Sequence, residues 1–317
     1  MANSKIMFSG VKPTGRPHIG NYFGAMRQFV QLQDKYDSLV MIADYHALNF
    51  IQNADEMTEN IVGVMMDYLA IGLDPKKVIL FKQSDVPEHT ELTWIFDTIT
   101  TMPYLQRAHA YKDALAKNKE ISAGTFNYPM LMATDILLYD PAVVPVGSDQ
   151  KQHVEIARDT AEKFNRIFGE TFKLPEPMIL SEVQTVPGID GQKMSKSYNN
   201  TIPLFASDEE IRKSVMSIVT DSGEGEPTNV KAIHLLVKPA AEVEKLYSES
   251  RGKYQSLKEA LITDLTAFIS PLREKRKEWE SRREEVLKIL KEGGEKARER
   301  AAAKMNIVRE RIGVKLY

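Results

Sequence analysis

The chain of 317 residues contains no cysteine. Disulfides, thiolate zinc sites and cysteine-ligated iron–sulfur clusters are therefore excluded, which fits a reducing compartment. No apolar run reaches the length that a membrane-spanning helix needs, and the first residues lack the apolar core of a secretory signal. We therefore expect a cytoplasmic protein with no membrane association.

The chain also lacks an excess of either charge, since 42 Lys and Arg oppose 44 Asp and Glu. This balance argues against a general nucleic-acid binder. The charge is nevertheless uneven, because residues 272–317 hold 15 basic and 9 acidic side chains, a net +6. Such an end can orient a polyanion, although a solvated helix face with Glu–Lys pairs has the same composition.

Short apolar runs alternate with amphipathic stretches in the first half of the chain. Residues 6–8, 39–43, 78–81 and 143–147 have the composition of buried strands, and helical spacing of apolar residues marks 18–32, 57–71 and 151–168. This alternation predicts an α/β fold, a Rossmann-like doubly wound parallel sheet with ligands beyond the carboxyl ends of its strands.

The pattern changes in the second half. Residues 174–192 are rich in Pro and Gly and are expected to form a loop. Beyond them the periodicity predicts helices only, at 208–219, 241–247, 254–291 and 294–312. We expect a catalytic domain at residues 1–190 and a smaller all-helical domain at residues 191–317.

Two distant segments carry residues suited to phosphate. Residues 13–21 (PTGRPHIGN) form a Gly/Pro turn into a helix, whose N-terminal N–H groups and dipole favour an anion. Residues 193–197 (KMSKS) place two lysines beside two hydroxyls in a loop. Either segment alone is compatible with an ordinary turn or a solubilising loop. Together they indicate one ATP held from both sides.

This pair of motifs resembles the two signatures of the class I aminoacyl-tRNA synthetases. Other fitting segments extend the resemblance over nearly the whole chain, namely residues 8–10, 44–47, 83–87, 128–139, 144–153 and 220–222. The resemblance is greatest to the tryptophan-specific enzymes of bacterial type.

The resemblance implies a two-step reaction. Tryptophan and Mg–ATP give Trp-AMP and pyrophosphate, and tryptophan then passes to the 3′ end of tRNA(Trp). It further implies a homodimer whose helical C-terminal part contacts the anticodon, and no protein-bound metal. By position, the resemblance implies a catalytic role for His18, Lys193, Ser195 and Lys196, and contacts with the ATP phosphates for Lys12, Pro13, Thr14, Gly20 and Asn21. It implies that the ribose is held by Gly147, Ser148 and Asp149 and that adenine is contacted by Val186. Met194 and Ser197 belong to the nucleotide-binding loop.

Asp135 is the candidate residue for amino-acid specificity. It lies in an apolar run, where an unpaired carboxylate is costly to bury, and indole offers one N–H donor. The other predicted pocket residues are Met132, Phe8, Val144 and Val146 as apolar walls, His46 beside the indole and Gln150 at the amino group. On the residues alone, each of these side chains has a purely structural alternative.

Three other functions are open. A tyrosine-specific synthetase would need more polar partners for the phenol than the apolar Phe8 and Met132 offer. A nucleotidylyltransferase shares the first turn but usually lacks the helical part. A non-catalytic paralogue would have no reason to keep both loop lysines.

Overall fold

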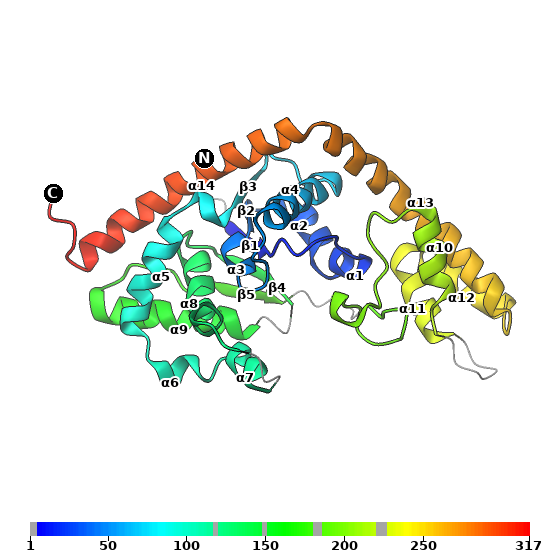
Figure 1. Ribbon diagram of the computed structural model, residues 1–317, viewed down its shortest axis with the longest axis horizontal. Coiled ribbons are helices and arrows are strands. Elements are labelled where there is room, and N and C mark those ends of the chain that lie inside the picture. The colour runs from blue at the N-terminus through cyan, green and yellow to red at the C-terminus, as the bar shows by residue number, and fades with distance from the viewer. Residues whose placement is uncertain (1–4, 117–119, 148–150, 180–185, 220–226) are drawn as a thin grey trace.

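A parallel sheet of five strands forms the centre of the molecule (Figure 1). The computed structural model describes residues 5–116, 120–147, 151–179, 186–219 and 227–317. The strands are β1 (Ile6–Val11), β2 (Asp37–Ile42), β3 (Val78–Lys82), β4 (Val143–Val146) and β5 (Glu176–Ile179), in the spatial order β3-β2-β1-β4-β5. Because the order reverses between β1 and β4, the carboxyl ends of these two strands flank the expected ligand crevice. The predicted doubly wound fold is confirmed.

Helices connect the strands and cover the sheet. One helical stretch between β1 and β2 comprises α1 (Ile19–Asn21), a π-helical segment η1 (Tyr22–Met26) and α2 (Arg27–Leu32). The others in this half are α3 (Asp44–Ala47), α4 (Ala54–Ala70), the 3₁₀ turn η2 (Gln83–Asp85), α5 (Glu88–Ile99), α6 (Met102–Leu105), α7 (His109–Ala116), α8 (Ala123–Leu137) and α9 (Lys151–Phe168). Strand β2 is buried along nearly its whole length, as expected for a parallel sheet covered on both faces.

The expectation of a loop throughout residues 174–192 was wrong. Residues Glu176–Ile179 form β5, which pairs in parallel with β4. Pro175 and Pro177 obscured this strand in the sequence. Proline is tolerated there because β5 lies at the edge of the sheet, where one side of the strand has no ladder hydrogen bonds to lose.

From Lys196 onward, the elements of the described residues are all helical. After a 3₁₀ turn η4 (Lys196–Tyr198) come α10 (Asp208–Met216), α11 (Thr228–Val237), α12 (Ala240–Glu249), α13 (Tyr254–Ser281) and α14 (Arg283–Arg311). One apolar core joins this part to the sheet body, and within it Phe268 of α13 stacks on Phe23 with ring centroids 5.3 Å apart. The division into domains at residue 190 therefore remains a prediction about the chain's organisation.

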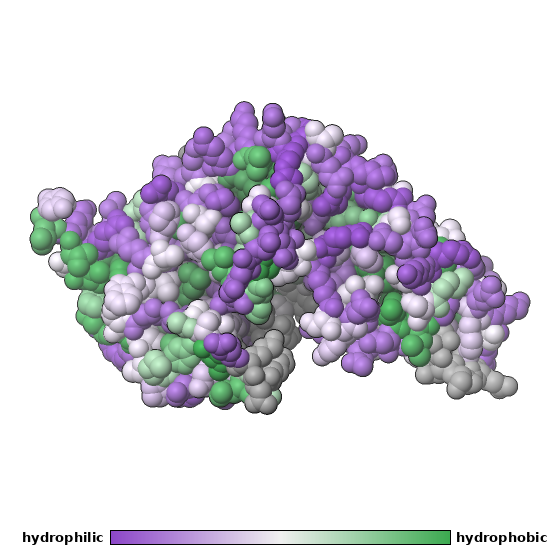
Figure 2. Space-filling view, viewed as in Figure 1, coloured by the Kyte–Doolittle hydropathy of each residue, from purple (hydrophilic) through white to green (hydrophobic). Residues whose placement is uncertain are grey.

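Many basic side chains of the C-terminal segment form ion pairs within the molecule. The outer surface along α13 and α14 is largely hydrophilic (Figure 2). Basic side chains of these two helices pair with carboxylates of other elements: Arg273 with Asp208, Arg276 with Asp67, Arg283 with Glu59, Arg300 with Asp37, Lys304 with Asp140 and Arg309 with Glu91. The basic segment is thus complementary to the acidic body on which it lies.

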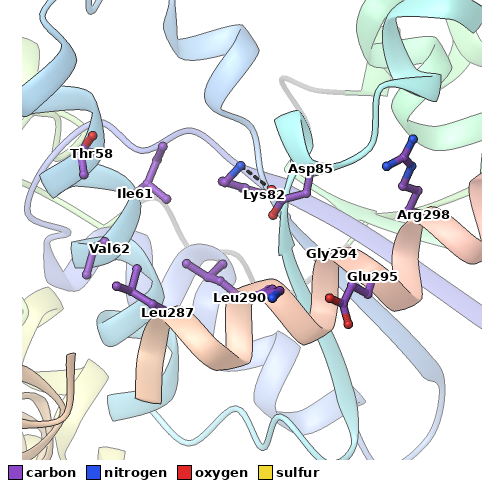
Figure 3. Close-up of a pocket in the computed structure, with 11 residues that line it drawn as sticks. Thr58, Ile61, Val62, Lys82, Asp85, Leu287, Leu290, Gly294, Glu295 and Arg298 are labelled. Atoms are coloured by element: carbon purple, nitrogen blue, oxygen red, sulfur yellow. Dashed lines mark hydrogen bonds and ion pairs between the residues drawn. The ribbon is translucent and has the colours of Figure 1, made fainter. Parts of the chain in front are cut away.

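Helix α14 returns across the sheet body and packs on β3. We expected a helix break near Gly293 and Gly294, but the break lies at Arg282 and both glycines are buried inside α14. A Cβ at Gly293 would lie 1.8 Å from the Leu80 carbonyl oxygen, and one at Gly294 would lie 2.8 Å from the Asp85 side chain. The glycines therefore serve close packing. Figure 3 shows this junction and the cavity of about 360 Å³ between α4, η2 and α14.

Replacing Gly293 with alanine tests this packing. The added methyl group meets backbone rather than a flexible side chain, so we expect Gly293→Ala to lower the free energy of unfolding by about 1–3 kcal/mol. Gly63 in α4 is the matched control, because its Cβ would find only Arg276 Nη2, at 3.8 Å. Gly63→Ala should be neutral or stabilising by up to about 1 kcal/mol. Urea unfolding of both variants measures the difference, and equal effects would contradict the argument.

Candidate functional site

Two adjoining cavities open where the strand order reverses. The first, the sheet cavity, has a volume of about 290 Å³ and is walled by residues of β1, α3, α8 and β4. The second, the turn cavity, has a volume of about 320 Å³ and lies between the turn after β1, α4 and the lysine loop. Gly10, Lys12, Ala25 and Phe29 line both cavities. Two small ligands would therefore meet at this shared wall.

The turn after β1 leads directly into a capped helix. His18 is the N-cap, where its Nδ1 accepts from the Asn21 backbone N–H at 3.2 Å and its own N–H donates to Asn21 Oδ1 at 3.0 Å. Gly15 has a φ of +80°, a conformation that favours glycine. Gly20 has little room for a side chain, since a Cβ there would lie 2.9 Å from His18 Nδ1.

The capping contact fixes the state of the imidazole. Because His18 Nδ1 accepts a hydrogen bond, the ring proton of the neutral form is on Nε2. Burial lowers the pKa of His18 to about 4, and the positive charge of Lys196 acts in the same direction. At neutral pH His18 is therefore an uncharged donor at the wall of the turn cavity.

The lysine loop is held by a buried asparagine. Asn200 accepts from the Ser195 backbone N–H at 2.7 Å and donates to Asp190 Oδ1 at 2.7 Å and to the Lys193 carbonyl oxygen at 3.2 Å. Met194 is buried and donates its N–H to the Val186 carbonyl oxygen at 2.9 Å. The loop has a fixed base, while the Lys193, Lys196 and Ser197 side chains lie on its exposed side.

The structure brings the two phosphate-type segments together. Ile19 donates to the Ile202 carbonyl oxygen at 3.0 Å, and Leu204 donates to that of Pro17 at 2.9 Å. Lys196 Nζ then reaches the carbonyl oxygens of Thr14 and Gly15, at 2.8 and 3.0 Å. Burial lowers the pKa of Lys196, although the nearby Asp67 carboxylate opposes this shift. Both segments thus line one cavity, and the predicted binding of ATP between them stays a prediction.

Lys12 lies where the two cavities meet. Its Nζ is 5.4 Å from the ring centroids of both Phe50 and Tyr128, within the range of a cation–π contact. The residue as a whole is exposed, but desolvation of the ammonium group between these rings lowers its pKa. A cation held on the shared wall can contact a phosphate on one side and a carboxylate on the other.

The sheet cavity has mainly apolar walls. Phe8 of β1, Met132 of α8, and Val144 and Val146 of β4, four of the residues predicted to wall the amino-acid pocket, all line it. Phe8 also stacks on Tyr139, with ring centroids 5.4 Å apart. These residues give the cavity apolar walls at the carboxyl ends of β1 and β4.

Asp135 is the buried charge at the wall of this cavity. Its Oδ2 lies 2.8 Å from His46 Nε2, and its Oδ1 accepts from Gln83 Nε2 at 2.7 Å. His89 Nδ1 lies 2.6 Å from the same Oδ1. Burial by itself would raise the pKa of Asp135, but the contacts with His46 and His89 outweigh it and lower the pKa to about 2. Asp135 is therefore a carboxylate at neutral pH.

The remaining predicted residues differ in how they relate to the cavities. Gly147 lines the sheet cavity, and Thr14, Asn21 and Ser195 line the turn cavity. Pro13 is buried and Val186 lies in the apolar core beneath the lysine loop. Lys193 lines neither of the two cavities. The predicted Ser148, Asp149 and Gln150 lie outside the described residues.

Sequence reasoning missed five residues of the site. Gln83 and His89 contact Asp135, Asn200 holds the lysine loop, Tyr128 lines the sheet cavity, and Asp67 lines the turn cavity. Asp67 is buried in α4 and bonds Arg276 at 2.6 Å, and burial raises its pKa to about 6 despite that guanidinium. Only Gln83 had a usable signal, its place at the end of β3.

Within the described part of the chain, no group of three or more His, Asp or Glu side chains is arranged to hold a metal ion. The same residues include no helix long and apolar enough to cross a membrane.

The crevice at the carboxyl ends of β1 and β4 has a capped turn on one side and the lysine loop on the other. This arrangement is typical of nucleotide-binding proteins of the doubly wound α/β class. Comparison with known proteins narrows this class. The family model "tRNA synthetases class I (W and Y)" matches residues 2–288. The chain belongs to this family.

Individual relatives match over almost their whole length. The tryptophan–tRNA ligases of Fusobacterium nucleatum and Rhodopirellula baltica are each 47% identical to this chain, and each match covers 98% of the chain and 98% or 99% of the relative. The crystal structure of tryptophanyl-tRNA synthetase from Campylobacter jejuni complexed with ADP and tryptophan superposes with a TM-score of 0.91 at 42% identity, covering 97% of this chain and 99% of that one. The tyrosyl-tRNA synthetase of Archaeoglobus fulgidus, at 22% identity and a TM-score of 0.67, shares the fold.

The His18 cap makes stability depend on pH. The imidazole has a pKa of about 4 in the folded chain and about 6.5 when unfolded, so between these values the unfolded state binds more protons. The stability that neutral His18 contributes is therefore lost as pH falls from 6.5 to 4. His18→Asn keeps an N-cap acceptor but does not titrate. The wild-type free energy of unfolding, relative to that of the variant, should fall through this window in urea titrations; a constant difference would contradict the assignment.

Proposed function

We propose that this chain is a tryptophan–tRNA ligase. It activates L-tryptophan with Mg–ATP to give Trp-AMP and pyrophosphate, and then transfers the tryptophanyl group to the 3′ end of tRNA(Trp). The observation that carries the proposal is the pairing of the two cavities. An apolar cavity with one buried carboxylate, Asp135, shares a wall with a cavity lined by His18 and Lys196.

The chemistry of the first step requires positioning and charge more than a protein nucleophile. The tryptophan carboxylate attacks the α-phosphate, the bond to the β-phosphate breaks, and pyrophosphate leaves with the electron pair. Lys196, with Lys193 and the Ser195 hydroxyl, stabilises the negative charge on the phosphates. His18 donates from Nε2, and Mg²⁺ enters as part of the Mg–ATP substrate. Preorganised donors of this kind supply most of the rate enhancement in phosphoryl chemistry.

The other nucleotide contacts are carried over from the family by position. Lys12, Pro13, Thr14, Gly20 and Asn21 would surround the phosphates. Gly147, Ser148 and Asp149 would hold the ribose, Val186 would face adenine, and Met194 and Ser197 would shape the loop. The exposed position of Lys193 and the buried position of Val186 imply that the lysine loop rearranges when ATP binds.

The apolar walls favour tryptophan over tyrosine. A phenol hydroxyl both donates and accepts, whereas the indole N–H only donates. Phe8 and Met132 supply no polar partner, and Asp135 at neutral pH supplies only acceptors. His46 packs beside the carboxylate, and Gln150 is the candidate for the amino group. The sequence-based preference for tryptophan thus has a physical basis in the cavity.

Two further partners belong to the proposal. We expect the helical part, residues 191–317, to contact the tRNA anticodon, although several of its basic side chains are already paired with carboxylates. We also expect a homodimer. Trp94 on α5 and Met102 on α6 are 71% and 61% exposed, and an apolar surface of this kind suits a subunit contact. A cytoplasmic location likewise remains a prediction.

Pyrophosphate–ATP exchange tests the reaction directly. Radiolabelled pyrophosphate should enter ATP when tryptophan is added, because formation of Trp-AMP is reversible. Exchange without an amino acid, or exchange that tyrosine supports as well as tryptophan does, would contradict the proposal. Charging of tRNA(Trp) by the same preparation then measures the second step.

Asp135→Asn tests the indole acceptor. The amide keeps the shape but replaces one carboxylate oxygen by an N–H₂ group and removes the charge, so the bond to the indole weakens. We expect kcat/KM for tryptophan in the exchange assay to fall by about ten- to a hundred-fold or more, because hydrogen bonds to charged groups are strong. The KM for ATP should not change.

Asp34→Asn is the matched control for this substitution, since Asp34 pairs with Lys77 on the surface, away from both cavities. Unchanged kinetics for tryptophan in Asp135→Asn would refute the acceptor role.

A further inference from the structure

The Asp135 carboxylate has fewer free acceptor directions than its burial alone suggests. An ionised carboxylate has about four lone-pair directions, two on each oxygen. Oδ1 accepts from Gln83 Nε2 at 2.7 Å, and His89 Nδ1 lies 2.6 Å from the same oxygen in an ion-pair contact that lacks hydrogen-bond geometry. Oδ2 faces one donor, His46 Nε2 at 2.8 Å. Hydrogen bonds thus occupy one direction on each oxygen, the His89 ring stands against Oδ1, and Oδ2 keeps a free direction.

The free acceptor direction on Asp135 Oδ2 lies on the cavity side of the carboxylate. Among the described residues, the wall of the sheet cavity includes His46 and Asp135 but neither Gln83 nor His89. Both of these side chains are fully buried. Gln83 and His89 therefore approach Oδ1 from behind the carboxylate, whereas Oδ2 and His46 border the space that a ligand would enter.

Separate contacts hold each of the two side chains behind the carboxylate, Gln83 and His89. The backbone N–H of Ser84 donates to Asp44 Oδ1 at 3.0 Å and its hydroxyl bonds Asp44 Oδ2, which fixes η2, with its Gln83, against α3. Helix α3 also carries His46, so the donors on the two oxygens are set relative to each other.

His89 is held from its other ring nitrogen. The Tyr139 hydroxyl lies 2.9 Å from His89 Nε2, and the Tyr139 ring is itself packed against Phe8 and Phe81. If Nδ1 carries the proton toward Asp135, Nε2 of the neutral ring accepts from the tyrosine. A chain from Tyr139 through His89 to Asp135 thus orients the carboxylate from the back.

We propose that Gln83 and His89 are positioning residues that cover Asp135 Oδ1 from behind, Gln83 by a hydrogen bond and His89 by a close ion-pair contact, leaving the amino-acid cavity a single acceptor on Oδ2. This inference rests on the proposed tryptophan specificity and explains how the specificity arises. One acceptor matches the one donor of an indole. A phenol donating to the same oxygen would keep lone pairs of its own, and His46 Nε2, the donor beside that oxygen, is already directed at Asp135.

Gln83→Met tests the proposal, because methionine has a similar length and no amide donors. Without Gln83 the carboxylate has a vacant direction on Oδ1 and less stabilisation of its charge. We expect the KM for tryptophan to rise about ten-fold or more with little change in kcat, as for a contact made equally in the ground and transition states. The KM for ATP should stay constant. The acid limb of kcat/KM for tryptophan should move to higher pH, because the pKa of Asp135 rises.

A tryptophan analogue with sulfur in place of the indole N–H separates this proposal from the function on which it rests. Wild-type enzyme should prefer tryptophan to this benzothiophene analogue in the exchange assay, and Gln83→Met should lose most of that preference. Equal use of both by the wild type would overturn the indole-acceptor role itself. A wild-type preference that Gln83→Met retains, with an unchanged pH profile, would overturn only the positioning role.

Two more variants complete the test. Gln33→Met is the matched control, because Gln33 uses its amide to cap the Gly72–Asp74 turn away from the cavities; it should change stability alone. Tyr139→Phe keeps the ring and removes the hydroxyl, so it remains informative if Gln83→Met does not fold. It should shift the acid limb in the same direction by a smaller amount. A folded Tyr139→Phe with wild-type kinetics at every pH would contradict the part assigned to His89.

Discussion

The buried carboxylate of Asp135 is the constraint on which much of the site depends. An ionised group at this depth is stable only if donors surround it. The side chains around it come from α3, with His46, and from two consecutive elements farther along the chain, η2 with Gln83 and α5 with His89. Each of these begins at or just beyond the carboxyl end of a sheet strand. The order of the sheet strands and the charge state of one side chain are thus coupled.

Helix α14 supports the same region from outside. Its two glycines allow the helix backbone to approach β3 and η2 more closely than any side chain would permit. Its basic side chains pair with carboxylates of the acidic body, among them Asp37, Glu91 and Asp140. The basic C-terminal segment, which suggested a surface for a polyanion, is therefore also explained by ion pairs within the molecule. Each exposed ion pair contributes little stability by itself. Apolar contacts and the close packing at the two glycines therefore hold α14 on the sheet body for the most part.

The sequence predicted those features that depend on local pattern. Alternating strands and helices, the turn into His18 and the lysine loop were all recognisable, and the motif pair was sufficient to predict one shared cavity. Prediction from the sequence failed where long-range packing overrides the local preference of the residues. Gly293 and Gly294 resemble a helix end but serve contact with β3, and Pro177 resembles a loop but lies in an edge strand. Gln83, His89 and Asn200 were missed because their roles depend on residues between 5 and 52 positions away.

The adjacency of the two cavities connects specificity to reaction. In the proposed complex, an indole bound to Asp135 in the sheet cavity would direct the rest of the amino acid toward the wall that Gly10 and Lys12 share with the turn cavity. A nucleotide between His18 and Lys196 presents its phosphates to that wall from the other side. Attack of a carboxylate on a phosphate joins two anions, and the ammonium of Lys12, partly desolvated between Phe50 and Tyr128, lies where their charges meet. In this proposal, the geometry that would select the amino acid would also reduce the electrostatic barrier to its activation.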